Sequence, residues 1–73
     1  MNRLQLEYEI ERLGHQTRLM RNDLNKIEKK LEENPDGLIR LTETRYILKY
    51  DLDVMELINS DLQKLLEIEK MIN

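Results

Sequence analysis

The stretch "EENPDGLIRLTETRY", residues 32–46, decides the fold, because it holds the only proline of the chain and one of its two glycines. Pro35 cannot continue a helix, and it moves Asn34 out of the α-helical region of backbone space. Either Pro-Asp-Gly forms a turn between two antiparallel helices, or Asn34 caps a second helix that continues as a bent rod. Because a rod would expose two apolar seams along about 100 Å, we predict the hairpin.

Before this stretch, apolar residues step by four and three along the chain. This is the seven-residue repeat of a helix that packs lengthwise against another helix. Only Thr17 interrupts the repeat with a polar side chain. The sequence therefore predicts a helix over residues 3–33, with these seam positions: Leu6, Ile10, Leu13, Thr17, Met20, Leu24, Ile27 and Leu31.

A second repeat of the same kind follows the proline, and it predicts a helix over residues 38–72 after a turn at 34–37. Polar residues break this repeat at three positions, and such a residue can fix the register of a seam at a cost in stability. The predicted seam positions are Leu41, Arg45, Leu48, Leu52, Met55, Asn59, Leu62, Leu66 and Glu69.

Folding the chain at Asp36 brings together seam residues whose numbers sum to 72. Leu24 then faces Leu48, and each layer pairs an a position with a d position, as an antiparallel coiled coil requires. The one ionic layer joins Arg3 to Glu69. We therefore predict an all-α fold: residues 1–73 form a single domain, an antiparallel two-helix coiled-coil hairpin.

The second helix carries more apolar residues than this seam uses. A helix that packs against one neighbour needs an apolar stripe of about 100°, whereas this helix is apolar over more than half of its circumference. We expect the surplus either to be buried in a homodimer that forms a four-helix bundle, or to dock another protein. The predicted interface residues are Ile47, Val54, Leu57, Ile58, Leu65, Ile68, Met71 and Ile72.

Composition narrows the classes of function. The chain has 73 residues, no cysteine, 37% charged residues and a net charge of -3. These values indicate one small domain with salt-bridged helix surfaces and no disulfide. We see no membrane-spanning segment and no signal peptide in MNRLQLEYEI, so we expect a cytoplasmic protein.

Catalysis is not expected. The only histidine, His15, falls on the outward side of the first helix, and no serine lies near it in the repeat. The Glu-x-x-His pattern of di-iron bundles is missing, and there is no glycine-rich phosphate loop or EF-hand loop. We predict neither a metal nor a cofactor. Gly14 either permits close approach of the helices or is a weak point that the helix tolerates.

The favoured function is protein–protein interaction, as an adaptor or as an inhibitor of a larger cellular protein. The segment "YDLDVMELINSDLQ", residues 50–63, contains four acids and no base. This surface could occupy the cleft of a basic DNA-binding protein as a nucleic-acid mimic, as small phage-type inhibitors do. The acidic residues predicted to face the partner are Asp51, Asp53, Glu56 and Asp61.

The alternative is direct nucleic-acid binding through basic residues of the first helix. Two such helices in a dimer would form a basic strip, although acidic residues interleave with the basic ones. A helical-hairpin dimer of this size resembles in architecture the Rop-type regulators that bind paired RNA loops, and this resemblance carries over no site residue. The candidate contacts are Arg18, Arg21 and Lys29.

Overall fold

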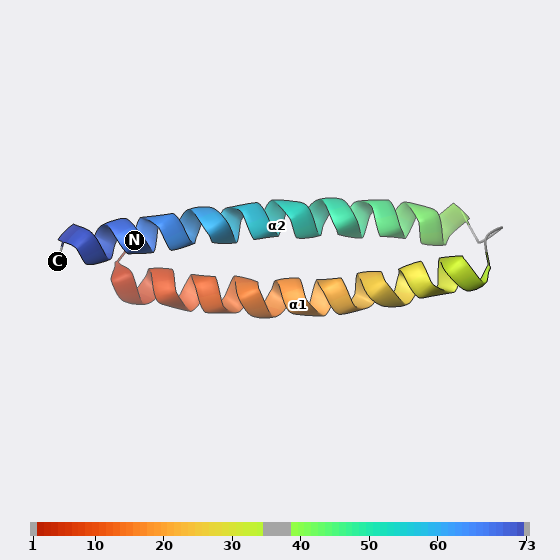
Figure 1. The fold of residues 1–73 in the computed structure, drawn as a ribbon, viewed down its shortest axis with the longest axis horizontal. Helices are drawn as coiled ribbons and strands as arrows, with labels where there is room; N and C mark the ends of the chain where they lie inside the picture. Colours follow the sequence, from red (N-terminus) through yellow and green to blue (C-terminus); the bar gives the residue numbers. More distant parts are fainter. Residues whose placement is uncertain (1, 35–38, 73) are drawn as a thin grey trace.

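Two long helices packed side by side make up the fold. The computed structural model describes residues 2–34 and 39–72, which form α1 (Arg3–Glu33) and α2 (Ile39–Ile72). The helices are antiparallel, and the start of α1 lies beside the last turns of α2 (Figure 1). The predicted helical hairpin is thus confirmed, and the bent rod is excluded. The molecule measures 56 × 15 × 14 Å.

Hydrogen bonds at its two ends explain where α1 begins and ends. At its start, the Asn2 side chain accepts a hydrogen bond from the Gln5 backbone N–H at 2.8 Å. The Gln5 side chain in turn accepts one from the Asn2 backbone N–H at 3.1 Å, which completes a capping box. At its end, the Asn34 backbone N–H donates to the Lys30 carbonyl at 3.0 Å. Asn34 is therefore the residue that terminates α1.

The predicted turn and the predicted start of the second helix fall mostly on residues 35–38, which lie outside the described residues. Asn34 itself has φ -130° and ψ 82°, outside the α-helical region, as expected for a residue that precedes proline. The described part of α2 begins at Ile39.

Burial follows the two predicted repeats closely. Within residues 2–34 and 39–72, the buried side chains are Leu6, Leu13, Leu24 and Leu52. All other seam positions of α1 and all but one of α2 are half-buried. The exception is Arg45, which is exposed; a long cationic side chain can lay its stem along the seam and keep its charge in water.

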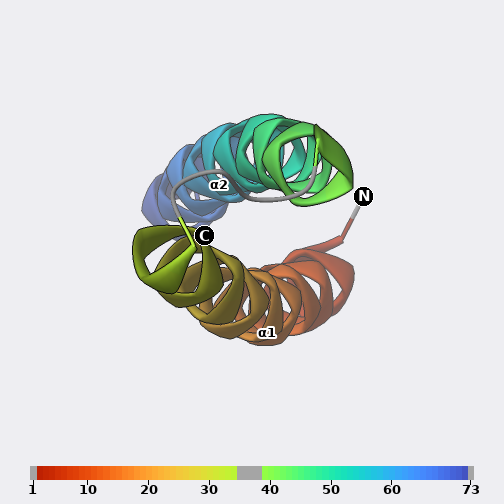
Figure 2. The same ribbon diagram turned by 90° about the vertical axis from the view of Figure 1, so that its right-hand side faces the viewer.

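Figure 2, which looks along the pair from the turn end, shows the two helices winding around each other in a left-handed sense. A seven-residue repeat imposes this winding. It spans two helical turns, or about 3.5 residues per turn, which is slightly less than the 3.6 residues per turn of a straight helix. The winding keeps one apolar stripe of each helix against its neighbour along the whole pair.

Thr17 and Asn59 are the two uncharged polar residues of this seam, and they differ in whether their polar side-chain atoms form hydrogen bonds. The Thr17 hydroxyl donates a hydrogen bond to the Gly14 carbonyl of its own helix at 3.0 Å. The Asn59 side-chain oxygen Oδ1 is buried and has no hydrogen-bond partner among the residues that the structure describes. Asn59 is thus the polar seam residue that costs stability.

Candidate protein-interaction surface

The most prominent surface feature is a row of exposed apolar side chains on α2. We call it the outer stripe, and its exposed fractions run from 38% at Val54 to 80% at Met71. These are the eight residues that the sequence predicts as an interface, and none of them is buried by the packing of α1 on α2. The outer stripe consists of Ile47, Val54, Leu57, Ile58, Leu65, Ile68, Met71 and Ile72.

α1 offers no comparable surface. Its exposed large apolar side chains are Leu4 and Tyr8, which border one surface hollow at the start of the helix, and Leu19. A few exposed apolar side chains of this kind are normal on protein surfaces. The unsatisfied apolar surface is therefore concentrated on one helix of the hairpin.

The four acidic residues predicted to face a partner do not gather on one face of α2. Glu56 forms an ion pair with Arg21 and so lies at the edge of the seam between the helices. Asp51, Asp53 and Asp61 are exposed and have no ion-pair partner among the described residues. Helical spacing places Asp51 and Asp61 within the outer stripe and Asp53 beside it.

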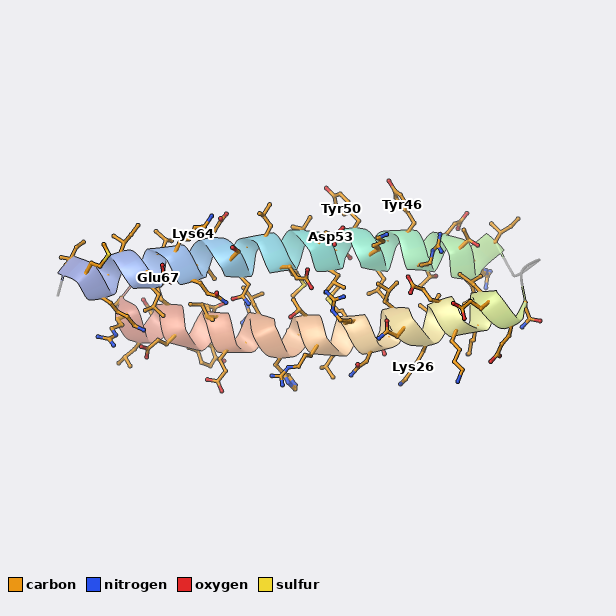
Figure 3. The ribbon with its side chains drawn as sticks, in the orientation of Figure 1. Lys26, Tyr46, Tyr50, Asp53, Lys64 and Glu67 are labelled. Atoms are coloured by element: carbon orange, nitrogen blue, oxygen red, sulfur yellow. The ribbon has the colours of Figure 1, made fainter. Side chains whose placement is uncertain are left out.

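The three candidate nucleic-acid contacts also differ in whether they form an ion pair. Arg21 is engaged with Glu56 across the helix pair, whereas Arg18 and Lys29 are exposed and without an ion pair in the described residues. Arg18 and Lys29 are eleven positions apart, which is close to three full turns, so they lie on the same side of α1. Lys26 projects outward from α1, away from α2 (Figure 3).

An aromatic pair that sequence reasoning passed over lies at the N-terminal half of α2. Tyr46 and Tyr50 project outward from α2, on the side away from α1 (Figure 3). They line a shallow surface hollow together with Thr42, Arg45, Lys49 and Asp53. The spacing of four residues, with basic residues just before each tyrosine, is the sequence signal that could have revealed this cluster.

The environment of His15 does not resemble a catalytic site. His15 is exposed and borders a shallow hollow formed with Tyr8, Glu11 and Arg12. Arg12 donates to the Glu9 carboxylate at 2.7 Å, and this hydrogen bond, with the attraction of the two charges, raises the pKa of Arg12. Among residues 2–34 and 39–72, no group of three or more histidine or acidic side chains is placed to hold a metal ion.

Gly14 borders open space. A Cβ atom added there would meet nothing within 4 Å. Close approach of the two helices is therefore not the reason for this glycine, and the interpretation as a tolerated weak point of α1 is the one that the structure favours.

Comparison with protein-family models, curated proteins and solved structures found no match. Neither described helix contains an 18-residue segment apolar enough to cross a membrane.

Proposed function

We propose that this protein is non-catalytic and acts by protein–protein interaction through the outer stripe of α2. The observation that carries the proposal is the exposure of all eight apolar side chains of the stripe in a hairpin whose described residues include only four buried side chains, all of them leucines. Exposed contiguous apolar patches of this extent are rare on monomers and mark interaction sites.

The first occupant of the stripe is a second copy of the chain, which gives a four-helix assembly. Four buried leucines among residues 2–34 and 39–72 make a small core. Ordering costs about 1.5 kcal/mol per residue, so a lone hairpin of this size is close to zero in net stability. Covering the stripe adds the apolar burial that the hairpin lacks.

An adaptor or an inhibitor of a larger protein is the cellular role that we propose for this assembly. Asp53 supports it, because it is exposed beside the stripe and has no ion pair among the described residues, so the assembly leaves it free to face a partner. With the net charge of -3, it contributes to a negative field that a basic protein would recognise, including a DNA-binding protein whose cleft the dimer would occupy.

Sedimentation of the purified chain tests the proposal. We expect a helical dimer at low micromolar concentration for the wild type and a monomer for Ile58→Asp, which places a charge in the stripe. Ser60→Asp is the matched control, because Ser60 is exposed on α2 outside the stripe, and it should remain dimeric. A stable, folded wild-type monomer would overturn self-association.

Nucleic-acid binding is the second candidate, and the exposed Arg18 and Lys29 on one side of α1 favour it. In a dimer these positions occur twice and would contact phosphates. A gel shift with nonspecific RNA and DNA at low salt tests it, and the double variant Arg18→Gln, Lys29→Gln should lose any shift that the wild type shows. A wild type without a shift, which also releases DNA from a basic protein, supports the inhibitor instead.

A further inference from the structure

The exposed face of α2 contains a second seven-residue repeat that includes two aspartates. Its residues step by four and three without a break, as a seam does. With 100° between successive residues, this row lies about 110° around α2 from the row that packs on α1. All its members are exposed, and we call it the second seam: Ile47, Asp51, Val54, Ile58, Asp61, Leu65, Ile68 and Ile72.

We propose that the second seam is an antiparallel self-interface, in which α2 of a second copy docks against α2 and the two aspartates determine its orientation. The inference rests on the proposed self-association and adds the orientation and register of the two chains. In this assembly each α2 lies between its own α1 and the α2 of the second copy.

A parallel arrangement brings identical residues face to face. Asp51 would then meet Asp51 of the second copy, and Asp61 would meet Asp61. Each contact places two like charges opposite each other in an interface that excludes water, where no ion pair offsets their repulsion. The parallel dimer is therefore disfavoured at two layers of the seam.

In an antiparallel arrangement the aspartates avoid each other only in certain registers. In one register, facing residues have numbers that sum to 119. Val54 then faces Leu65, Ile47 faces Ile72, and every layer pairs an a position of one helix with a d position of the other. Asp51 then faces Ile68, and Asp61 faces Ile58. All eight residues of the seam take part, and no aspartate meets another.

The neighbouring registers are worse for identifiable reasons. A shift of one repeat to a sum of 112 brings Asp51 directly opposite Asp61, twice in the two-fold dimer. The opposite shift, to a sum of 126, leaves Ile47 beyond the end of its partner helix. Of the three registers, the one at 119 is thus the one that uses all eight residues of the second seam and places no aspartate directly opposite another.

The same register accounts for the exposed apolar residues that flank the second seam. In an antiparallel coiled coil, the residues that flank one side of the seam pack beside residues at the same repeat position of the second helix. At the flank, Tyr50 lies next to Met71 of the second copy, and Leu57 lies next to Lys64, whose methylene stem can cover it. The exposure of Leu57 (64%) and Met71 (80%) in the single hairpin is then explained.

The size of this contact suits a stable dimer. The second seam spans 26 residues, or about 38 Å of helix. Two such surfaces, with their flanks, bury an area on the order of 1,000 Å2 or more, which is the lower range of specific interfaces. The contact is therefore large enough for a specific dimer.

Cysteine cross-linking tests the orientation, because the chain has no cysteine of its own. Single variants Val54→Cys and Leu65→Cys are mixed under mild oxidation. We expect the mixed disulfide dimer, because the two positions face each other, and little linkage of Val54→Cys with itself. Self-linkage of Val54→Cys would indicate a parallel dimer, and linkage of Val54→Cys with Ile58→Cys would indicate the 112 register; either result overturns the proposal.

The double variant Asp51→Leu, Asp61→Leu tests the role of the aspartates. We expect dimerisation to tighten about tenfold or more, and self-linkage of Val54→Cys to appear in this background, because the parallel dimer is no longer excluded. Asp53→Leu is the control and should change neither. Retention of one antiparallel linkage in the double variant would show that the aspartates do not select the orientation.

Sedimentation of the same proteins under reducing conditions separates the two levels of inference. A monomeric wild type would overturn both the proposed self-association and the proposed orientation of the two chains. A dimeric wild type whose cross-links disagree with the 119 register would overturn only the proposed orientation and would leave the proposed function in place.

Discussion

Arg21 of α1 and Glu56 of α2 form an ion pair that joins the two helices near the middle of the hairpin. Their numbers sum to 77, whereas facing seam residues are predicted to sum to 72. Side chains on a helix lean toward its N-terminus, and in an antiparallel pair these two lean toward each other. The contact is therefore compatible with the predicted register, offset by about 7.5 Å along the axis.

This ion pair is expected to contribute little to stability. Both side chains are about half exposed, at 55% and 44%, so water and salt screen the attraction. A double-mutant cycle with Arg21→Gln and Glu56→Gln in urea should give a coupling free energy of about 0.2–1 kcal/mol. The coupling should fall further in 1 M NaCl. A coupling that is larger and insensitive to salt would mean that the pair is shielded from water in the assembled protein.

The capping box at the start of α1 should matter more. Asn2→Ala removes the acceptor for the Gln5 backbone N–H, and we expect a loss of about 1 kcal/mol in the free energy of unfolding. Asn22→Ala is the matched control, because Asn22 is an exposed asparagine in the interior of the same helix. Equal effects of the two substitutions in urea unfolding at one protein concentration would contradict a specific capping role.

Gly14 offers the opposite case, a position where the natural residue weakens the helix. Gly14→Ala should raise the free energy of unfolding by about 0.5–1 kcal/mol, because alanine loses less backbone entropy and its Cβ enters open space. Thermal and urea unfolding measure the gain, with Gln16→Ala as a control expected to change stability much less. A destabilised Gly14→Ala variant would show that another chain packs closely on α1 at this point.

The sequence alone was sufficient for the hairpin and its seam, because the four-three spacing reports directly on which side of a helix is buried. Leu6 and Leu52 were both predicted from that spacing and are buried. The spacing does not report how long side chains extend, which is why Arg45 was placed in the seam although it is exposed. The ion pair of Arg21 with Glu56 depends on the axial offset between the two helices and on the direction of the two side chains. The spacing of residues within one helix gives neither.

The candidate interface was predictable to a similar depth. Composition and spacing identified the outer stripe, and the structure shows its eight side chains exposed on the hairpin. The capping box can also be recognised in the sequence, since Asn2 and Gln5 fit the known pattern of a polar cap followed three residues later by glutamine or glutamate. The missing hydrogen bond of Asn59 could not be read from sequence, because it depends on what surrounds the amide oxygen.

That unpartnered oxygen predicts a stabilising substitution. Asn59→Leu should raise the free energy of unfolding by about 1–3 kcal/mol, because it removes a buried acceptor without a hydrogen bond and adds apolar contact to the seam. Ser60→Ala, at the exposed neighbouring position, is the control and should be nearly neutral. A polar seam residue can also fix register, so the stabilised variant should be checked for altered pairing by cross-linking. A clear loss of stability would mean that Asn59 has a partner in the assembled protein.

A comparison of two leucines on α2 distinguishes the hairpin core from the interaction surface. Leu52 is 2% exposed and Leu57 is 64% exposed, although they are five residues apart. Leu52→Ala should lower the free energy of unfolding by about 2–5 kcal/mol, because it leaves a cavity between the helices. Leu57→Ala should leave the helical circular dichroism of a dilute sample unchanged and should act mainly on self-association, measured by sedimentation. If Leu57→Ala unfolds the chain as Leu52→Ala does, even at concentrations where the wild type is monomeric, then the outer stripe belongs to the core of a single chain.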